Sequence, residues 1–267
     1  MDIHTGYAEV EGTRLYYEMA GSGFPLVLIH GFGADRRVWD YLFETFAQQY
    51  NVVRYDSRGF GKSALPSGEV YAHPKDLKGL LDHLHITQAH IVGQSMGGEI
   101  GIEFALAYPA STRSLVVVDP ALGGYVWSQA YNESYYAVGA KTAESGFKSA
   151  IELLMAHPMH VPLGEHPEAA DKLRLMLANY SAWHMANADT WQRPVPAAIE
   201  QLASIHTPTL VVIGERDVPD FHAIAEIVAE RIPHAQKKVI IGSGHVVPLE
   251  APQALGELVL KFLDTVT

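Results

Sequence analysis

Three side chains that can act together in nucleophilic catalysis stand shortly after predicted strands: Ser95, Asp217 and His245. A neutral imidazole can take the proton of a serine hydroxyl, which is otherwise a poor nucleophile near pH 7. A carboxylate on the other ring nitrogen fixes the tautomer and stabilises the cation that forms. These three residue types together predict a serine nucleophile, a histidine base and an aspartate that orients the base.

Ser95 lies in the motif G-x-S-x-G, formed by Gly93, Ser95 and Gly97. The apolar run 89–92 precedes this motif, and the helix-compatible run 99–108 follows it. Side chains two residues before and after the serine would collide where a strand folds back into a helix, so glycine is required there. The serine hydroxyl would then project from the turn at the positive end of the helix.

The elements that must position these residues alternate between strands and helices. Strands are predicted at 26–29, 51–55, 89–92, 114–118, 209–213 and 237–241, helices at 74–84, 99–108, 221–231 and 252–263, and an opening antiparallel hairpin at 7–10 and 14–19. This alternation predicts an α/β fold with a mostly parallel sheet and helices on both sides. The carboxyl ends of parallel strands share one edge, so the three side chains can meet there.

The region 121–199 interrupts this alternation and contains no evident buried strand. Helix-like runs occur at 149–155 and 169–180. We expect residues 1–120 and 200–267 to form the core and 121–199 to form a helical cap over its functional edge. Aromatic residues of this region can line an acyl pocket or pack in the core, and the sequence leaves both open: Tyr125, Trp127, Tyr131, Tyr135, Tyr136, Trp183 and Trp191.

Five motifs in order along nearly the whole chain resemble the α/β-hydrolase family. They are His30-Gly31, the turn from Asp56 to Ser63, the Ser95 turn, Gly-Glu-Arg-Asp217 and Gly-Ser-Gly-His245. The order serine, aspartate, histidine is characteristic of that family. The resemblance is strongest to its esterases, enol-lactonases and carbon–carbon-bond hydrolases, and it implies an α/β-hydrolase fold.

The resemblance also implies an oxyanion hole made by the backbone N–H groups of Phe32 and Met96. His30 and Gly31 would shape the loop that carries Phe32. The chain lacks the His-Gly-Gly-Gly loop of lipases, so the bulky Phe32 is expected to narrow the site.

Two other aspartates compete with Asp217 for the role of the acid. Asp119 also follows a predicted strand, and some members of the resembled family place the acid at that earlier strand end. The Gly-x-x-Asp context favours Asp217, whereas Asp119 precedes Pro120 as a turn residue and Asp220 suits a helix N-cap. An aspartate nucleophile, as in the dehalogenases of that family, is disfavoured because the position holds Ser95.

Composition and spacing argue against other classes of function. A net charge of −11 disfavours nucleic acid as a partner, and the chain has no cysteine for disulfides or thiolate chemistry. The Gly61-Lys62-Ser63 sequence lacks the first glycine of a phosphate-binding loop, because Asp56 stands there. His157, His160 and His166 are separated by prolines that prevent one helix from presenting them together, so no metal is expected.

No secretion signal and no apolar run long enough to span a membrane is evident, so we expect a cytoplasmic protein without a membrane partner. The predicted activity is serine hydrolysis of a small, fairly apolar carboxylic ester without a cofactor. The sequence leaves three alternatives open. The same residues could open a lactone or cleave a carbon–carbon bond beside a ketone, or the chain could be a slow-turnover ligand receptor on a hydrolase scaffold. The sequence does not determine the oligomeric state.

Overall fold

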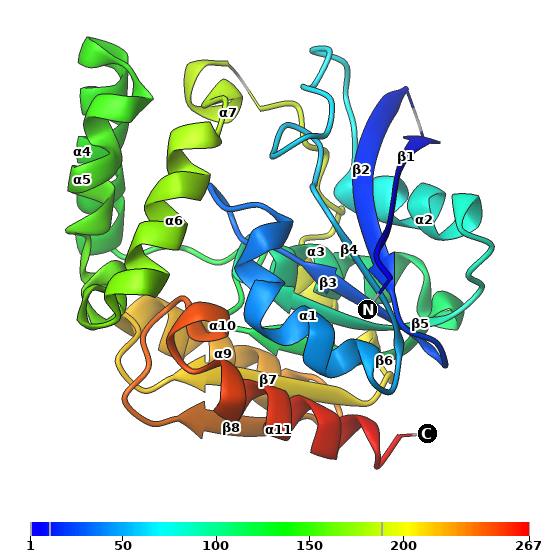
Figure 1. Ribbon diagram of the computed structural model, residues 1–267. Coiled ribbons are helices and arrows are strands. Elements are labelled where there is room, and N and C mark those ends of the chain that lie inside the picture. The colour runs from blue at the N-terminus through cyan, green and yellow to red at the C-terminus, as the bar shows by residue number, and fades with distance from the viewer. Residues whose placement is uncertain (1, 11, 188, 267) are drawn as a thin grey trace.

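An eight-stranded sheet forms the centre of the computed structural model, which describes residues 2–10, 12–187 and 189–266 (Figure 1). The spatial order is β1-β2-β4-β3-β5-β6-β7-β8. The strands are β1 (His4–Val10), β2 (Thr13–Ala20), β3 (Pro25–Ile29), β4 (Asn51–Tyr55), β5 (Ala89–Gln94), β6 (Thr112–Val118), β7 (Thr209–Gly214) and β8 (Gln236–Ile240). β1 pairs with β2 and β2 with β4 in antiparallel fashion, and the other pairs are parallel.

The central strands are apolar on both faces because helices cover both sides of the sheet. Every residue of β5 and β7 is buried, whereas β8 at the edge exposes most of its side chains. Two lysines, Lys237 and Lys238, lie on this edge strand, where charge disfavours pairing with another chain.

The flanking helices of the core are α1 (Asp40–Ala47), α2 (His73–His83), α3 (Met96–Ala107), α8 (Ala198–Gln201), α9 (Pro219–Arg231), α10 (Val247–Glu250) and α11 (Pro252–Leu263). Figure 1 shows α1 and α11 packed together in front of the sheet, with α2 and α3 behind it. The predicted α/β-hydrolase-type arrangement, a mostly parallel sheet flanked by helices, is confirmed. The expected hairpin is also formed, although Glu11 in its turn lies outside the described residues.

The α-helices between β6 and α8 are α4 (Gln129–Ser145), α5 (Phe147–Met155), α6 (Pro167–Asn179) and α7 (Trp183–Ala186). Figure 1 shows α4, α5 and α6 grouped to one side of the sheet, with α5 packed against both of the others. Across the described residues of 121–199, β pairing is limited to a bridge between Trp191 and Tyr71. The assignment of 121–199 as a separate cap stays a prediction.

None of the helices in the described ranges combines the length and the hydropathy needed to cross a bilayer.

Candidate active site

The turn between β5 and α3 carries Ser95 in a backbone conformation that side chains rarely adopt, with φ 55° and ψ −115°. Its glycines allow a close approach of backbone segments. A Cβ at Gly93 would overlap the carbonyl oxygen of Gly97, and a Cβ at Gly97 would overlap that of Ile29. The serine is therefore held at a strained turn between a buried strand and a helix N-terminus.

Ser95, His245 and Asp217 form one hydrogen-bonded chain at the carboxyl ends of β5, β8 and β7. The Nε2 atom of His245 lies 3.0 Å from Ser95 Oγ, and its Nδ1 atom lies 2.8 Å from Asp217 Oδ2. His245 and Asp217 are buried, so little water competes for these bonds. In this arrangement the imidazole can accept the serine proton on Nε2 while Nδ1–H donates to the carboxylate.

Two backbone N–H groups lie at the same site, those of Phe32 and Met96. Met96 is the first residue of α3, where an N–H has no acceptor within the helix. Neither N–H donates to an acceptor within the described ranges, and both residues line the same cavity as Ser95. They are therefore free to bind an oxygen that gains negative charge beside the serine.

His30 and Gly31 hold the loop that carries Phe32. His30 donates from Nδ1 to the carbonyl oxygen of Gly31 at 2.8 Å, and its Nε2 atom accepts from the N–H of Ser57 at 3.0 Å. Burial lowers the pKa of His30, in agreement with a neutral ring that uses one nitrogen as donor and the other as acceptor. A side chain at Gly31 would overlap Gln94.

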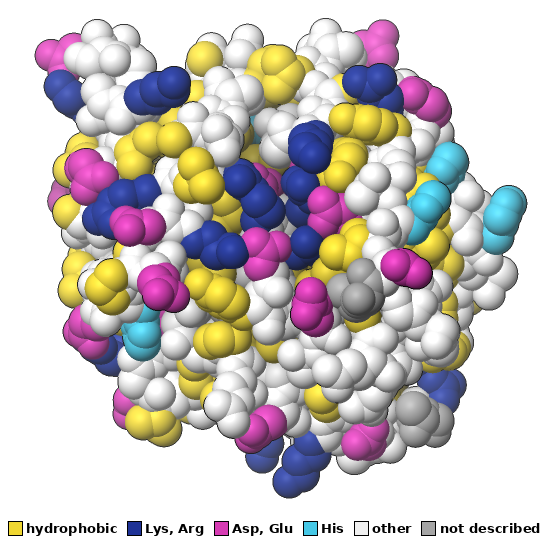
Figure 2. Space-filling view, in the orientation of Figure 1, with side chains coloured by type: hydrophobic (Ala, Val, Ile, Leu, Met, Phe, Trp, Pro, Cys, Tyr) yellow, Lys and Arg dark blue, Asp and Glu magenta, His cyan; other side chains and the backbone are white. Residues whose placement is uncertain are grey.

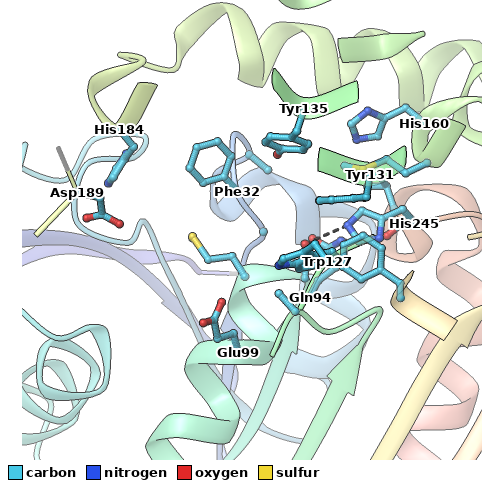
Figure 3. A pocket seen from close by; sticks show the side chains of 18 of the residues that line it. Phe32, Gln94, Glu99, Trp127, Tyr131, Tyr135, His160, His184, Asp189 and His245 are labelled. Carbon is cyan, nitrogen blue, oxygen red and sulfur yellow. Dashed lines mark hydrogen bonds between the residues drawn. The ribbon is translucent and has the colours of Figure 1, made fainter. Parts of the chain in front are cut away.

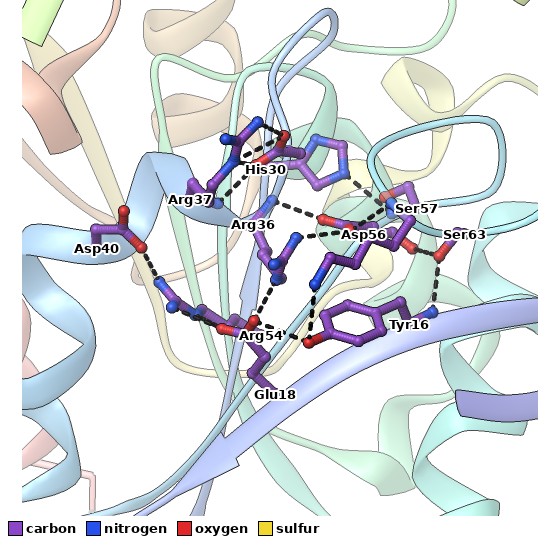
Figure 4. A network of polar contacts seen from close by, with 12 residues as sticks. Tyr16, Glu18, His30, Arg36, Arg37, Asp40, Arg54, Asp56, Ser57 and Ser63 are labelled. Carbon is purple, nitrogen blue, oxygen red and sulfur yellow. Dashed lines mark hydrogen bonds and ion pairs between the residues drawn. The ribbon is translucent and has the colours of Figure 1, made fainter. Parts of the chain in front are cut away.

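A buried ion-pair network lies behind this loop (Figure 4). Arg36 pairs with Asp56 at 2.9 Å and with Glu18 at 2.7 Å, and Glu18 also pairs with Arg54. Asp56 additionally accepts from the N–H of Lys62, so its carboxylate fills the turn in which a nucleotide phosphate would otherwise bind. The segment from Asp56 to Ser63 is accordingly a structural turn.

A cavity of about 440 Å³ opens over Ser95 (Figure 3). Three aromatic residues, Trp127, Tyr131 and Tyr135, line it near His245 (Figure 3), and the rings of Trp127 and Tyr131 stack at 4.2 Å. Of the aromatic residues left open by the sequence, Tyr136 and Trp191 also line the cavity, whereas Tyr125 and Trp183 do not. This part of the cavity suits an apolar group.

The opposite side of the cavity is charged (Figure 3). Glu99 is buried and accepts from Arg193 Nε at 3.0 Å, and the Arg193 guanidinium lies 4.0 Å from the centre of the Trp191 ring. Asp189 also lines this side and accepts from the Tyr71 hydroxyl at 3.0 Å. The cavity therefore has an aromatic part and a polar part on either side of Phe32.

Asp119 and Asp220, the two other candidate acids, bond to groups other than His245. Asp119 accepts from the N–H of Gly214 at 2.8 Å and is buried beside Asp217. The expectation that Asp220 caps a helix is wrong, because α9 begins one residue earlier, at Pro219, with Val218 as its N-cap. The Asp220 carboxylate instead accepts from the N–H and hydroxyl of Ser128, at the start of α4.

Two of the three histidines in the 157–166 segment, His157 and His160, make other hydrogen bonds. His157 bonds to the hydroxyl of Ser134 at 2.7 Å, and His160 donates from Nδ1 to the carbonyl oxygen of Leu154 at 2.9 Å. Within the described ranges, Asp119, Asp217 and His245 are the group whose ligand atoms lie close enough for a metal ion. His245 and Asp217 in that group already bond to each other.

Gln94 and His160 are among the site residues that the sequence analysis missed, as are Glu99, Asp189 and Arg193 in the charged part of the cavity. Gln94, directly before Ser95, donates from Nε2 to the carbonyl oxygen of His245, and its place in the turn motif was a signal that could have revealed it. His160 lies in the cavity with its ring centre 6.5 Å from that of His245. Burial lowers the pKa of His160 to about 3, so it is a neutral group there, and no local pattern marks it.

A family model described as the alpha/beta hydrolase fold matches residues 25–252. The chain belongs to this family.

Individual α/β-hydrolase relatives match nearly end to end. The chain is 29% identical to 3-oxoadipate enol-lactonase 2 of Acinetobacter baylyi, over 88% of this chain and 86% of the relative. It is 28% identical to 2-hydroxy-6-oxo-6-phenylhexa-2,4-dienoate hydrolase of Burkholderia cepacia, over 94% and 91%. A solved thermophilic esterase from Thermogutta terrifontis superposes with a TM-score of 0.81 and 26% identity, over 98% of this chain and 99% of that one.

Proposed function

We propose that this α/β-hydrolase is a serine esterase that cleaves small, fairly apolar carboxylic esters. The observation that carries the proposal is the continuous chain from Ser95 Oγ to His245 and Asp217, with bonds of 3.0 and 2.8 Å, at the floor of a cavity. Nucleophile, base and orienting acid are then within hydrogen-bond reach before a substrate binds.

In the proposed reaction, Ser95 Oγ attacks the ester carbonyl carbon while His245 Nε2 takes the serine proton. The backbone N–H groups of Phe32 and Met96 bind the carbonyl oxygen as it becomes an oxyanion. His245 then gives the proton to the alcohol oxygen as the carbon–oxygen bond breaks. Water then attacks the acyl-serine while His245 takes its proton, and His245 returns a proton to Ser95 Oγ as the acid leaves. The reaction therefore needs no cofactor.

The substrate class is supported by the size and lining of the cavity. A volume of about 440 Å³ suits a small molecule, and Trp127, Tyr131 and Tyr135 offer an apolar surface next to His245. The similarity to a solved esterase agrees with this choice. We place the reaction in the cytoplasm, with a small molecule as the partner.

A lactone is the second candidate substrate, and the charged part of the cavity is the observation that favours it. Opening a lactone leaves the alcohol tethered to the acyl group, so a compact ring that carries polar groups must fit as a whole. Glu99 and Arg193 lie where such groups could be bound. The enol-lactonase among the relatives is consistent with this alternative, as the carbon–carbon-bond hydrolase is with cleavage beside a ketone.

Steady-state kinetics on p-nitrophenyl esters of increasing acyl length, simple lactones and a vinylogous 1,5-diketone separate these activities. We expect the highest kcat/KM on short esters and no effect of EDTA, because the proposed mechanism uses a histidine base and no metal. Turnover of lactones alone would favour the second candidate. Bound ligand with very slow turnover would indicate a receptor, and loss of activity on chelation would contradict the serine mechanism.

A further inference from the structure

Asp119 and Asp217 stand side by side at the ends of the neighbouring parallel strands β6 and β7. Both side chains are buried, and one carboxylate oxygen of each lies, together with a ring nitrogen of His245, within 4.8 Å of the others. Two carboxylates so close and out of water cannot both ionise without a large electrostatic cost. One proton must therefore be shared by the pair.

The hydrogen-bond donors around the two groups indicate where that proton lies. Asp217 accepts two N–H donors, His245 Nδ1 on one oxygen at 2.8 Å and the N–H of Val218 on the other at 2.7 Å. Asp119 accepts only the N–H of Gly214 on Oδ1, and among the described residues no N–H or O–H group donates to its buried Oδ2 atom. Since N–H donors stabilise the ionised form, Asp217 is the anion and Asp119 the acid.

We propose that Asp119 is a positioning residue whose protonated Oδ2 donates a hydrogen bond to Asp217 and so holds the carboxylate that orients His245. This inference rests on the proposed esterase function in one respect, the assignment of His245 as the base. It gives the unpartnered oxygen a partner and adds a third donor to the carboxylate of Asp217. The chain of hydrogen bonds then runs from Asp119 through Asp217 and His245 to Ser95.

The backbone conformation at Asp119 is strained, as is common for residues at functional sites. Its φ is 46°, a left-handed conformation that is uncommon for residues other than glycine but is tolerated by aspartate and asparagine. Such strain persists where the surrounding structure over-determines the conformation, and it concentrates at functional sites.

A third carboxylate, that of Glu250, also disfavours a negative charge on Asp119. Glu250 in α10 is buried near the pair and accepts from the N–H groups of Gly244 and Val246. Burial, the Asp217 carboxylate and Glu250 all raise the pKa of Asp119 well above its usual range, while the N–H of Gly214 opposes this. These groups therefore favour the protonated form of Asp119.

The test compares Asp119→Asn, which keeps an N–H donor and a carbonyl acceptor in place, with Asp119→Ala, which removes both. We expect Asp119→Ala to lower kcat on a p-nitrophenyl ester about tenfold with little change in KM, and Asp119→Asn to lower it about threefold or less. The rise of kcat with pH should move to higher pH in Asp119→Ala, because an Asp217 that lacks its donor stabilises the His245 cation more strongly. It should stay near the wild-type position in Asp119→Asn.

Asp220→Ala is the matched control, because it removes another buried aspartate near the site without touching Asp217, and its pH profile should not move. Equal losses in Asp119→Asn and Asp119→Ala, or an unmoved profile in Asp119→Ala, would overturn the proposal.

A second measurement does not depend on activity or on the folding of Asp119→Ala. The infrared difference spectrum of wild type minus Asp119→Asn at neutral pH should contain the carbonyl stretch of a protonated carboxylic acid. The buried Glu103 has its pKa raised to about 8 by burial and by Glu99, so its own band is common to both proteins and cancels. A difference spectrum with only a carboxylate band overturns the inference. If wild type cleaves no ester but the acid band is present, the proposed function fails while the shared proton stands.

Discussion

The side chain of Gln94 donates from Nε2 to the backbone carbonyl oxygen of His245 at 3.0 Å. Gln94 is the last residue of β5 and directly precedes Ser95, so one hydrogen bond ties the serine turn to the loop after β8. The distance between the serine oxygen and the imidazole therefore depends on a residue that takes no part in proton transfer.

Replacing Gln94 by leucine, which has a similar volume but no donor, should lower kcat about tenfold with a smaller change in KM. A small displacement of His245 away from Ser95 is enough for such a loss, because a misplacement of about 1 Å can cost about 10²-fold in rate. Kinetics on p-nitrophenyl acetate, with thermal unfolding as the control for folding, measure the effect. Unchanged kcat would mean that the loop is held by its other contacts.

Asp217→Asn should lower the rate by roughly 10⁴-fold, because an amide cannot enforce the tautomer that His245 needs. Asp119→Asn should have a far smaller effect, since Asp119 contacts Asp217 and Gly214 rather than orienting His245 through a hydrogen bond of its own. Parallel kinetics on the two variants decide between the two aspartates. A larger loss at Asp119 would reverse the assignment of the acid.

Esters of primary alcohols should be cleaved well and esters of tertiary alcohols hardly at all. The Phe32 ring packs edge-on against Phe60 and Tyr180, with ring centres 5.6 and 5.7 Å apart, so its loop has little freedom to retreat from a branched carbon. A carbonyl pushed out of line loses its hydrogen bonds to the oxyanion donors. The measurement is kcat/KM for ethyl and tert-butyl acetate under the same conditions, and comparable values would contradict a narrow site.

Glu103→Gln should make the free energy of unfolding less dependent on pH between about pH 4.5 and 8. Burial and the adjacent Glu99 raise the pKa of Glu103 from 4.5 to about 8 in the folded protein. The folded state therefore binds more protons than the unfolded state in that window. Stability falls there by at most about 1.4 kcal/mol per pH unit as pH rises. Urea unfolding at several pH values tests this, and parallel curves for the two proteins would contradict it.

The positions of Ser95, Asp217 and His245 followed from local patterns, because each stands just beyond an apolar run that forms a strand. Parallel strands bring their carboxyl ends to one edge, so local patterns were sufficient for this part of the site. The start of α9 could also have been predicted correctly, since proline favours the first helical position and Pro219 precedes Asp220.

The lining of the cavity and the apposition of Asp119 with Asp217 lay beyond sequence reasoning. Trp127 lines the cavity and Tyr125, two residues away, does not, and no periodicity distinguishes them. The Glu99–Arg193 pair joins residues 94 positions apart through a long connection. Such contacts depend on how segments without regular spacing pack over the sheet, which a single sequence does not encode in any local pattern.

The central claim, that Ser95 is the nucleophile, is tested most directly by intact-mass spectrometry after treatment with a p-nitrophenyl phosphonate ester. Wild type should gain the mass of one phosphonyl group and lose its ester hydrolysis. Ser95→Ala should remain unlabelled, fold normally and have an activity lower by about 10⁶-fold, the scale of losing a triad nucleophile. Labelling of Ser95→Ala to the same extent, or retention of most of its activity, would contradict the account.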